Sequence, residues 1–299
     1  MVIGHHGGMS TAAAPVLPAA LRLAAVHLDV ADLSRAVAWY ERALGLRMHE
    51  HRETLATLGD GGHPVLVLHE DRDAQPAGRT AGLYHYALLY PSREELARAA
   101  LRLSASQTPI QGASDHETHE AIYLDDADGN AIELAADRPR AEWPEHLGYA
   151  ARPKPLGFES LMSTVAGEQA TPWVGEGLRI GHLHLHVGDI EEGLHFYRDT
   201  VGFELQANLG TAAFVSAGGY HHHLAFNVWN GVGAPAPPPH SVGLHAWSVE
   251  LPGNDLGALR ARLEAAGHGL RDVPGGFLVR DPWRTAMTVV TSTPSILLQ

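Results

Sequence analysis

The chain contains no cysteine, which excludes disulfides, thiolate metal ligands and a cysteine nucleophile. Any metal must therefore be held by nitrogen and oxygen atoms. Lysine and arginine together number 21, against 34 aspartate and glutamate residues, and no basic cluster is present. Nucleic acid and anionic membrane surfaces are therefore not expected partners, and small molecules remain.

Long apolar runs are also absent from the sequence. No run approaches the roughly 20 residues that a membrane helix needs, and residues 1–20 lack the charged start and apolar core of a signal peptide. We therefore expect a cytoplasmic protein without a membrane span. Its 299 residues are enough for two domains of ordinary size.

The sequence contains an internal repeat. Residues 25–66 superpose without a gap on part of the third quarter of the chain, 157 places further on. Segments of the second quarter superpose on the fourth with two offsets, 161 places at its start and 155 places at its end. The matched pairs include Asp32 and Asp189, Tyr40 and Tyr197, Gly45 and Gly202, Gly82 and Gly243, and Asp126 and Asp281. The chain is therefore predicted to consist of four copies of one structural unit.

Each quarter is predicted to form a strand, a helix and then two or three strands. In the first quarter Val26, Leu28 and Val30 alternate with other residues, which is the period of a strand. The following residues have helical spacing, with Asp32 as N-cap and Gly45 as the end of the helix. This is an α+β fold. The predicted organisation is a flexible arm over 1–20, domains over 21–137 and 178–292, and a proline-rich linker over 138–177.

Differences between the copies indicate a metal site. The superposition places His182 on Ala25 and His223 on Leu66, so the third quarter has imidazoles where the first has apolar side chains. In the other pair of quarters, His85 falls on Ala246 and Glu133 on Thr288. The second and third quarters therefore carry a candidate ligand set of His85, Glu133, His182 and His223.

Strand parity supports this ligand set. His182 shares a strand face with His184 and His186, opposite a face of apolar residues, and His223 shares a face with Asn227. The polar faces are expected to point into a cup, with the apolar faces against the helices. His184 or His186 is expected to line the same pocket without being a ligand.

Two stretches carry a family resemblance. The run HLHLHVGDIEEGLHFYRDTVGF resembles the vicinal oxygen chelate superfamily, and DHETHEAIYLDDADGNAIE resembles the signature of extradiol ring-cleaving dioxygenases. Ala127 departs from that signature, which usually has proline there. With GLYHYALLYPSREEL and AGGYHHHLAFNVW, the resemblance covers residues 21–291 and extends to the catechol-2,3-dioxygenase branch of bacterial four-module proteins.

This resemblance implies a fold and a site. The fold would be four βαβββ modules in two tandem domains with curved, barrel-like sheets. His85 and Glu133 match the second histidine and the glutamate of the family's iron triad, and His182 matches the first histidine of a module. Because these residues come from the middle two modules, the metal is expected between modules two and three. His223 is either a fourth ligand or a pocket residue.

The resemblance implies oxygenase chemistry. Fe(II) is the expected metal, with Zn, Ni or Mn as other divalent ions that the site could hold, and the substrates would be a catechol-type aromatic and O2. His116 matches the signature histidine, Tyr123 can hydrogen-bond a substrate oxygen, and His221 or His222 is expected over the metal. We predict His116, Tyr123 and His222 as the catalytic residues.

Two other functions are compatible with the sequence. The first is a glyoxalase-type lyase or isomerase, which would favour a carboxylate at the closing strand of each module, where the third module offers His223. The second is a non-catalytic binding or resistance protein of the same fold, in which loss of all ligands would be expected. The sequence is also compatible with a homodimer.

Overall fold

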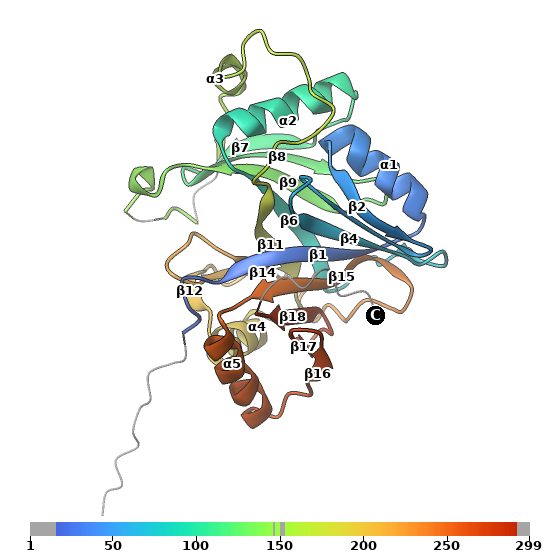
Figure 1. Ribbon diagram of the computed structural model, residues 1–299. Coiled ribbons are helices and arrows are strands. Elements are labelled where there is room, and N and C mark those ends of the chain that lie inside the picture. Colours follow the sequence, from blue (N-terminus) through green and yellow to red (C-terminus); the bar gives the residue numbers. More distant parts are fainter. Residues whose placement is uncertain (1–15, 146, 150–152, 292–299) are drawn as a thin grey trace, which may run out of the picture.

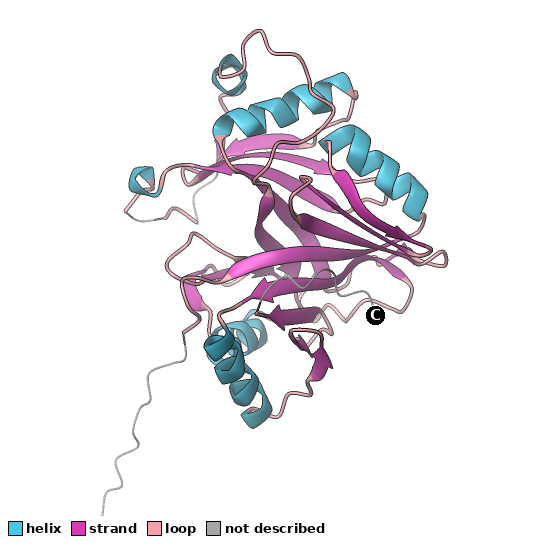
Figure 2. Ribbon diagram, viewed as in Figure 1, coloured by secondary structure: helices cyan, strands magenta, loops and turns pink. Residues whose placement is uncertain are grey.

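The computed structural model describes residues 16–145, 147–149 and 153–291. The predicted α+β fold is confirmed: four modules of the strand–helix–strands type build two curved sheets of nine strands each, with the main helices on the outside (Figure 2). The sheets are open at their ends and do not close into barrels.

The first two modules span the N-terminal half of the chain (Figure 1). Module one consists of β1 (Arg22–Val30), α1 (Leu33–Leu44), β2 (Arg47–Arg52), β3 (Leu55–Gly59) and β4 (Pro64–Glu70), followed by the short β5 (Gln75–Pro76). Module two consists of β6 (Gly82–Tyr90), α2 (Arg93–Ala105), β7 (Gly112–Asp115), β8 (His119–Asp125) and β9 (Ala131–Asp137).

The other two modules follow a connecting segment that contains η1 (Arg140–Glu142), β10 (Lys154–Pro155) and α3 (Phe158–Ser163). Module three consists of β11 (Arg179–His186), α4 (Ile190–Leu194), η2 (His195–Val201), β12 (Glu204–Asn208), β13 (Ala212–Ser216) and β14 (Leu224–Asn227). Module four consists of β15 (Ser241–Glu250), α5 (Gly253–Ala265), β16 (Arg271–Val273), β17 (Gly276–Arg280) and β18 (Ala286–Val290).

Each sheet combines one module from each half of the chain. The outer sheet joins modules one and four through the antiparallel pair β1 and β15, and the middle sheet joins modules two and three through β6 and β11. The predicted pairing of modules two and three is thus confirmed. Each sheet therefore contains strands from both of the domains that the sequence predicts.

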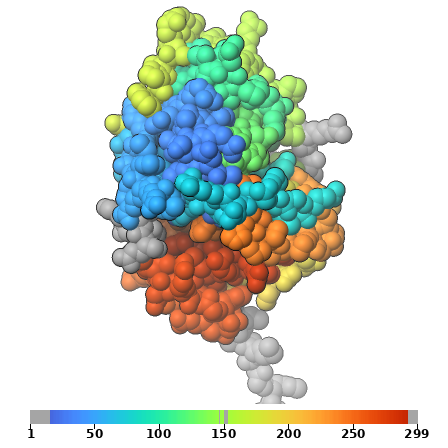
Figure 3. Space-filling view, turned by 90° about the vertical axis from the view of Figure 1, so that its right-hand side faces the viewer, coloured from blue at the N-terminus to red at the C-terminus, as the bar shows by residue number. Residues whose placement is uncertain are grey.

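Helix packing, in contrast, stays within each half of the chain. The Tyr40 hydroxyl of α1 donates to Asp126 of module two over 2.6 Å, and the Tyr197 hydroxyl of η2 donates to Asp281 of module four over 2.8 Å. These repeat-related bonds are buried. The space-filling view shows the N-terminal half above the C-terminal half, in close contact (Figure 3). Sheet pairing and helix packing therefore link all four modules into one body.

The predicted helix boundaries of modules one and three are confirmed. The side chain of Asp32 accepts the N–H of Arg35, and that of Asp189 accepts the N–H of Glu192, as N-caps do. Gly45 and Gly202 end the two helical segments in the left-handed conformation, with φ of 71° and 97°, which glycine adopts without steric cost.

The predicted arm falls mainly on residues 1–15, which lie outside the described residues. Of the remaining residues of this segment, Leu17 is buried and its N–H donates to the carbonyl of Gly202. None of the helices in the described ranges is long and apolar enough to span a membrane.

Candidate metal centre

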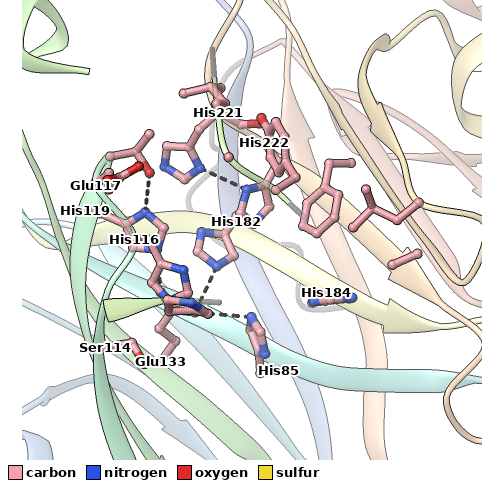
Figure 4. A pocket seen from close by; sticks show the side chains of 18 of the residues that line it. His85, Ser114, His116, Glu117, His119, Glu133, His182, His184, His221 and His222 are labelled. Atoms are coloured by element: carbon pink, nitrogen blue, oxygen red, sulfur yellow. Dashed lines mark hydrogen bonds and ion pairs between the residues drawn. The ribbon is translucent and has the colours of Figure 1, made fainter. Parts of the chain in front are cut away.

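Three of the four predicted ligands meet in the middle sheet. His85 lies on β6, His182 on the adjacent β11, and Glu133 on β9, which pairs with the other edge of β6. The Nε2 atoms of the two histidines approach the same carboxylate oxygen, Oε2 of Glu133, at 3.3 Å for His85 and 3.2 Å for His182 (Figure 4). Their ligand atoms all lie within 4.8 Å of one another.

The donor set fits a divalent metal ion. Within the described part of the chain, His85 Nε2 is a buried polar atom that forms no hydrogen bond, and Glu133 Oε1 is a buried oxygen whose near neighbour is His119 Nε2, at 3.0 Å. Leaving such atoms unpaired is costly, and a cation bound by these side chains would remove that cost. Two imidazoles and one carboxylate are also the ligand set typical of non-heme iron, with coordination positions left open.

The charge state of the site also suits a metal. Burial opposes ionisation of Glu133, but its electrostatic interaction with His182 and its contacts with His119 and His182 outweigh burial and hold the pKa of Glu133 well below its usual range. Burial lowers the pKa of His85 to about 3, with neighbouring histidines adding to the effect and Glu133 opposing it. An ionised carboxylate beside a neutral imidazole is the form that binds metal.

The fourth predicted ligand, His223, is not brought into this group. The sequence superposition placed it on Leu66, but Leu66 pairs with Val26 while Leu224 pairs with the equivalent Leu183. The true counterpart of Leu66 is therefore Leu224, and the predicted register is wrong by one residue in this strand. The reason is an extra residue in the hairpin between β13 and β14.

Strand register shows which residue holds the fourth position. Glu133 pairs with Ala87, two residues after His85, and Ala225 pairs with His184, two residues after His182. Ala225 is thus the counterpart of Glu133. His223 lies two residues earlier in the chain, just before β14 and roughly 7 Å away. Its Nδ1 accepts the N–H of Ala217.

The predicted catalytic pair His116 and Tyr123 is in contact. His116 Nε2 lies 2.7 Å from the Tyr123 hydroxyl. Burial and the charge of Glu133 raise the pKa of Tyr123 well above its usual value, so its phenol keeps its proton. Burial, together with the neighbouring His119, lowers the pKa of His116 to about 4. A neutral imidazole and a protonated phenol therefore lie together in the site.

His222, the third predicted catalytic residue, covers His182. Their ring centroids are 4.2 Å apart, and His222 Nδ1 lies 2.9 Å from Nδ1 of His221. His221 also approaches Asp137 Oδ1 at 3.3 Å. Both histidines are buried, so these contacts fix His222 at the edge of the group formed by His85, Glu133 and His182.

Sequence reasoning missed two members of the cluster, His119 and Asp137. His119 Nε2 lies 3.0 Å from Glu133 Oε1, and its ring stacks between those of His116 and His221. Strand parity would have found both residues: His119 shares a face of β8 with Tyr123, and Asp137 shares a face of β9 with Glu133.

A cavity of about 470 Å³ is lined by the three candidate ligands and by His116, His119, Tyr123, His221 and His222. His184, which sequence parity placed at the pocket, is part of its wall. The inner end is formed by the metal-ligand candidates and the catalytic candidates. The outer end carries Tyr84, Leu209, Phe214 and Trp229. The volume suits a small aromatic molecule.

Comparison with known proteins agrees with this geometry. The sequence pattern of the Glyoxalase/Bleomycin resistance protein/Dioxygenase superfamily matches residues 22–134 and 179–291. Catechol-2,3-dioxygenase of Bacillus subtilis is 37% identical over 263 residues, which is 85% of this chain and 92% of that protein.

Two solved structures share the fold. A putative dioxygenase from Bacillus subtilis has a TM-score of 0.62 at 14% identity, covering 94% of this chain and 87% of its own. Glyoxalase I from Zea mays has a TM-score of 0.55 at 16% identity, covering 91% and 92%. At these identities the likeness concerns the fold alone.

Proposed function

Because the chain belongs to the glyoxalase/bleomycin resistance/dioxygenase superfamily, we propose that it is a metal-dependent extradiol dioxygenase that cleaves a catechol-type aromatic with O2. The observation that carries the proposal is the convergence of His85, Glu133 and His182 on one point at the inner end of the cavity. The identity to the Bacillus subtilis catechol-2,3-dioxygenase supports the reaction class.

The metal proposed for this site is Fe(II). His85, His182 and Glu133 would hold it, and it would supply open coordination positions for a catechol and O2 and so allow electron transfer between them. Mn, Ni or Zn suit the same nitrogen and oxygen donors. His223 is proposed as a residue outside the ligand set, because Ala225 holds the fourth position.

His116 and Tyr123 are proposed to remove a proton from the catechol. The Tyr123 hydroxyl lies 2.7 Å from Nε2 of the neutral His116. In the tautomer of His116 with its proton on Nδ1, a proton taken up at the Tyr123 oxygen can pass on to Nε2. A general base must be neutral before it accepts a proton, and burial keeps His116 in that state near neutral pH.

His222 is proposed to contact the substrate from the opposite side. Its Nδ1 is engaged by His221, which leaves Nε2 as the nitrogen for a substrate or oxygen atom. The ring of His222 covers that of His182, so it also limits the entry of water to this side of the site. Neither role requires His222 to be a metal ligand.

Oxygen uptake tests the reaction class. Fe(II)-reconstituted protein should consume O2 with a panel of catechols and form a yellow ring-fission product, and His85→Ala should do neither. A hemithioacetal assay run beside it tests the glyoxalase-type alternative. Turnover of the hemithioacetal without oxygen uptake from any catechol would refute the proposal.

A further inference from the structure

The outer end of the cavity has an aromatic wall that the proposed chemistry does not use. We define the outer wall as Tyr84, His184, Leu209, Phe214 and Trp229, all of which line the cavity. Trp229 is 50% exposed, Leu209 41% and Tyr84 38%. Large apolar side chains gathered in the open at the mouth of a cavity are typical of a binding surface.

Trp229 is held in place by a hydrogen-bond network. Asn227 Oδ1 accepts the N–H of Trp229 over 2.9 Å and contacts His186 Nδ1 at 2.8 Å. Because a backbone N–H can only donate, the oxygen of Asn227 faces Trp229, and the amide nitrogen donates to His184 Nε2 over 2.9 Å. These bonds fix the backbone of Trp229 to Asn227, the last residue of β14.

The rings of the outer wall form a continuous path to the metal ligands. The Trp229 ring is 5.3 Å from both Tyr84 and His184, between ring centroids. Tyr84 and His184 in turn lie 5.0 and 5.2 Å from the ring of the candidate ligand His85. A substituent on a metal-bound catechol that points away from His116 would thus lie along these rings.

The outer wall offers no cation to pair with an anionic substituent, because none of its five side chains is a lysine or an arginine. The carboxylates in the described lining of the cavity are those of Asp115, Glu117 and Glu133, and its one ammonium group is on Lys154. Asp115 is paired with Arg138 over 2.8 Å. The Lys154 ammonium is already bound to Glu117 over 2.5 Å.

We propose that the outer wall, with Trp229 as its main contact, is a specificity subsite that selects catechols with an uncharged alkyl or aryl substituent over catechols with a carboxylate. The proposal rests on the proposed function in taking a metal-bound catechol as the ligand. Trp229 contacts the substituent and no reacting atom, so it sets substrate preference and leaves the ring-cleavage step unchanged.

Anaerobic binding of two ligands of matched shape tests the subsite. The Fe(II)-loaded protein is titrated without O2 with 4-isobutylcatechol and with 3,4-dihydroxyphenylacetate, which carries a carboxylate in place of the branched alkyl end. We expect the neutral ligand to bind at least about tenfold more tightly. Trp229→Ala should weaken it about tenfold and change the Kd of unsubstituted catechol by less than about twofold.

Two variants serve as controls. Trp229→Phe should keep most of the preference, because it retains an aromatic face. Trp173→Ala should leave all three Kd values unchanged, because Trp173 has a similar exposure of 43% but packs on Arg47 and does not line the cavity.

Three outcomes would overturn the subsite: equal or tighter binding of the carboxylate ligand, an equal loss for all ligands in Trp229→Ala, or no binding of the substituted catechols. Failure of the proposed function is distinguishable, since admitting O2 would then give no ring fission although the Trp229-dependent preference persists. Ring fission without that preference refutes the subsite alone.

Discussion

The two sheets of the molecule have the same strand arrangement, but at four equivalent positions the middle sheet carries three candidate metal ligands and the outer sheet carries none. In the middle sheet these positions hold His85, Glu133, His182 and Ala225; in the outer sheet they hold Ala246, Thr288, Ala25 and Val67. Both sheets keep the antiparallel central pair, and a buried tyrosine–aspartate bond links the two sheets within each half of the chain. The fold therefore does not depend on the ligand set.

The outer sheet also contains a cluster of histidines, but their side chains are paired with one another or with a carboxylate and do not converge on one point. His27 Nδ1 lies 3.2 Å from His69 Nε2, and His245 Nδ1 lies 3.0 Å from Asp29 Oδ1. These side chains satisfy one another in pairs. In the middle sheet, by contrast, three ligand atoms converge and leave His85 Nε2 without a hydrogen bond among the described residues.

The largest expected effect separates Glu133 from its counterpart Thr288. Glu133→Gln should weaken metal binding by about 100-fold or more, because it removes the only anionic donor of the set. Thr288→Val, at the equivalent position of the outer sheet, should keep the metal content of the wild-type protein. Metal analysis of both purified variants decides this, and full metal content in Glu133→Gln would contradict the ligand assignment.

A smaller effect is expected from pH on the outer cluster. Burial, with the charges of His69 and His245, lowers the pKa of His27 to about 3. An unfolded histidine titrates near 6.5, so below that pH only the unfolded chain takes up the proton. The free energy of unfolding therefore does not depend on the ionisation of His27 above pH 6.5. Below pH 6.5 protonation of His27 in the unfolded chain lowers this free energy progressively, until the pH reaches about 3.

Urea unfolding of the metal-free protein measures this loss. Between pH 6.5 and about 4.5 the free energy of unfolding should fall less in His27→Asn than in the wild type, by at most about 1.4 kcal/mol per pH unit. His240→Asn is the control, because its hydrogen bond to Asp71 raises the pKa of His240 and so acts with the opposite sign. Equal slopes in wild type and His27→Asn would show that His27 is not held neutral.

His223→Ala should change metal affinity by less than about twofold, in contrast to His85→Ala, which should abolish binding. The variant loses the hydrogen bond from the Ala217 N–H and the ring contact with Tyr220, at a cost of about 1 kcal/mol in stability. Titration of the apoprotein with Fe(II) gives the affinity. Loss of metal binding in His223→Ala would show that His223 is a fourth ligand.

The smallest expected effect is that of Ala25→His. This substitution returns one imidazole to the outer sheet, but Ala246 and Thr288 at the neighbouring equivalent positions supply no further ligand. The metal content per chain should stay the same. A second equivalent of bound metal would show that the outer sheet needs only one ligand to form a site.

Much of the fold could be predicted from the sequence because its determinants are local. Asp32 and Gly45 cap α1 by rules that depend on a few neighbouring residues. His85, Glu133 and His182 could be found because they occupy strands whose repeat register has no insertion. His223 could not be placed, because Leu58 pairs with Leu66, eight residues on, whereas Val215 pairs with Leu224, nine residues on.

The remaining features depend on which strands become neighbours. The contact between His119 and Glu133 requires the pairing of β8 with β9, and the pair His222 and His182 requires a turn to fold back over β11. The outer wall joins Tyr84 on β6 to Trp229 after β14 across β11. Local patterns of residues do not specify such long-range neighbours.

The position of the bound metal tests the central claim most directly. Crystals of the Fe(II)-loaded protein, measured at the iron absorption edge, should show one anomalous peak within bonding distance of His85 Nε2, His182 Nε2 and a carboxylate oxygen of Glu133. A peak instead between His221 and His222, at His223, or beside His27 and His69 in the outer sheet would contradict the assignment of the site to modules two and three.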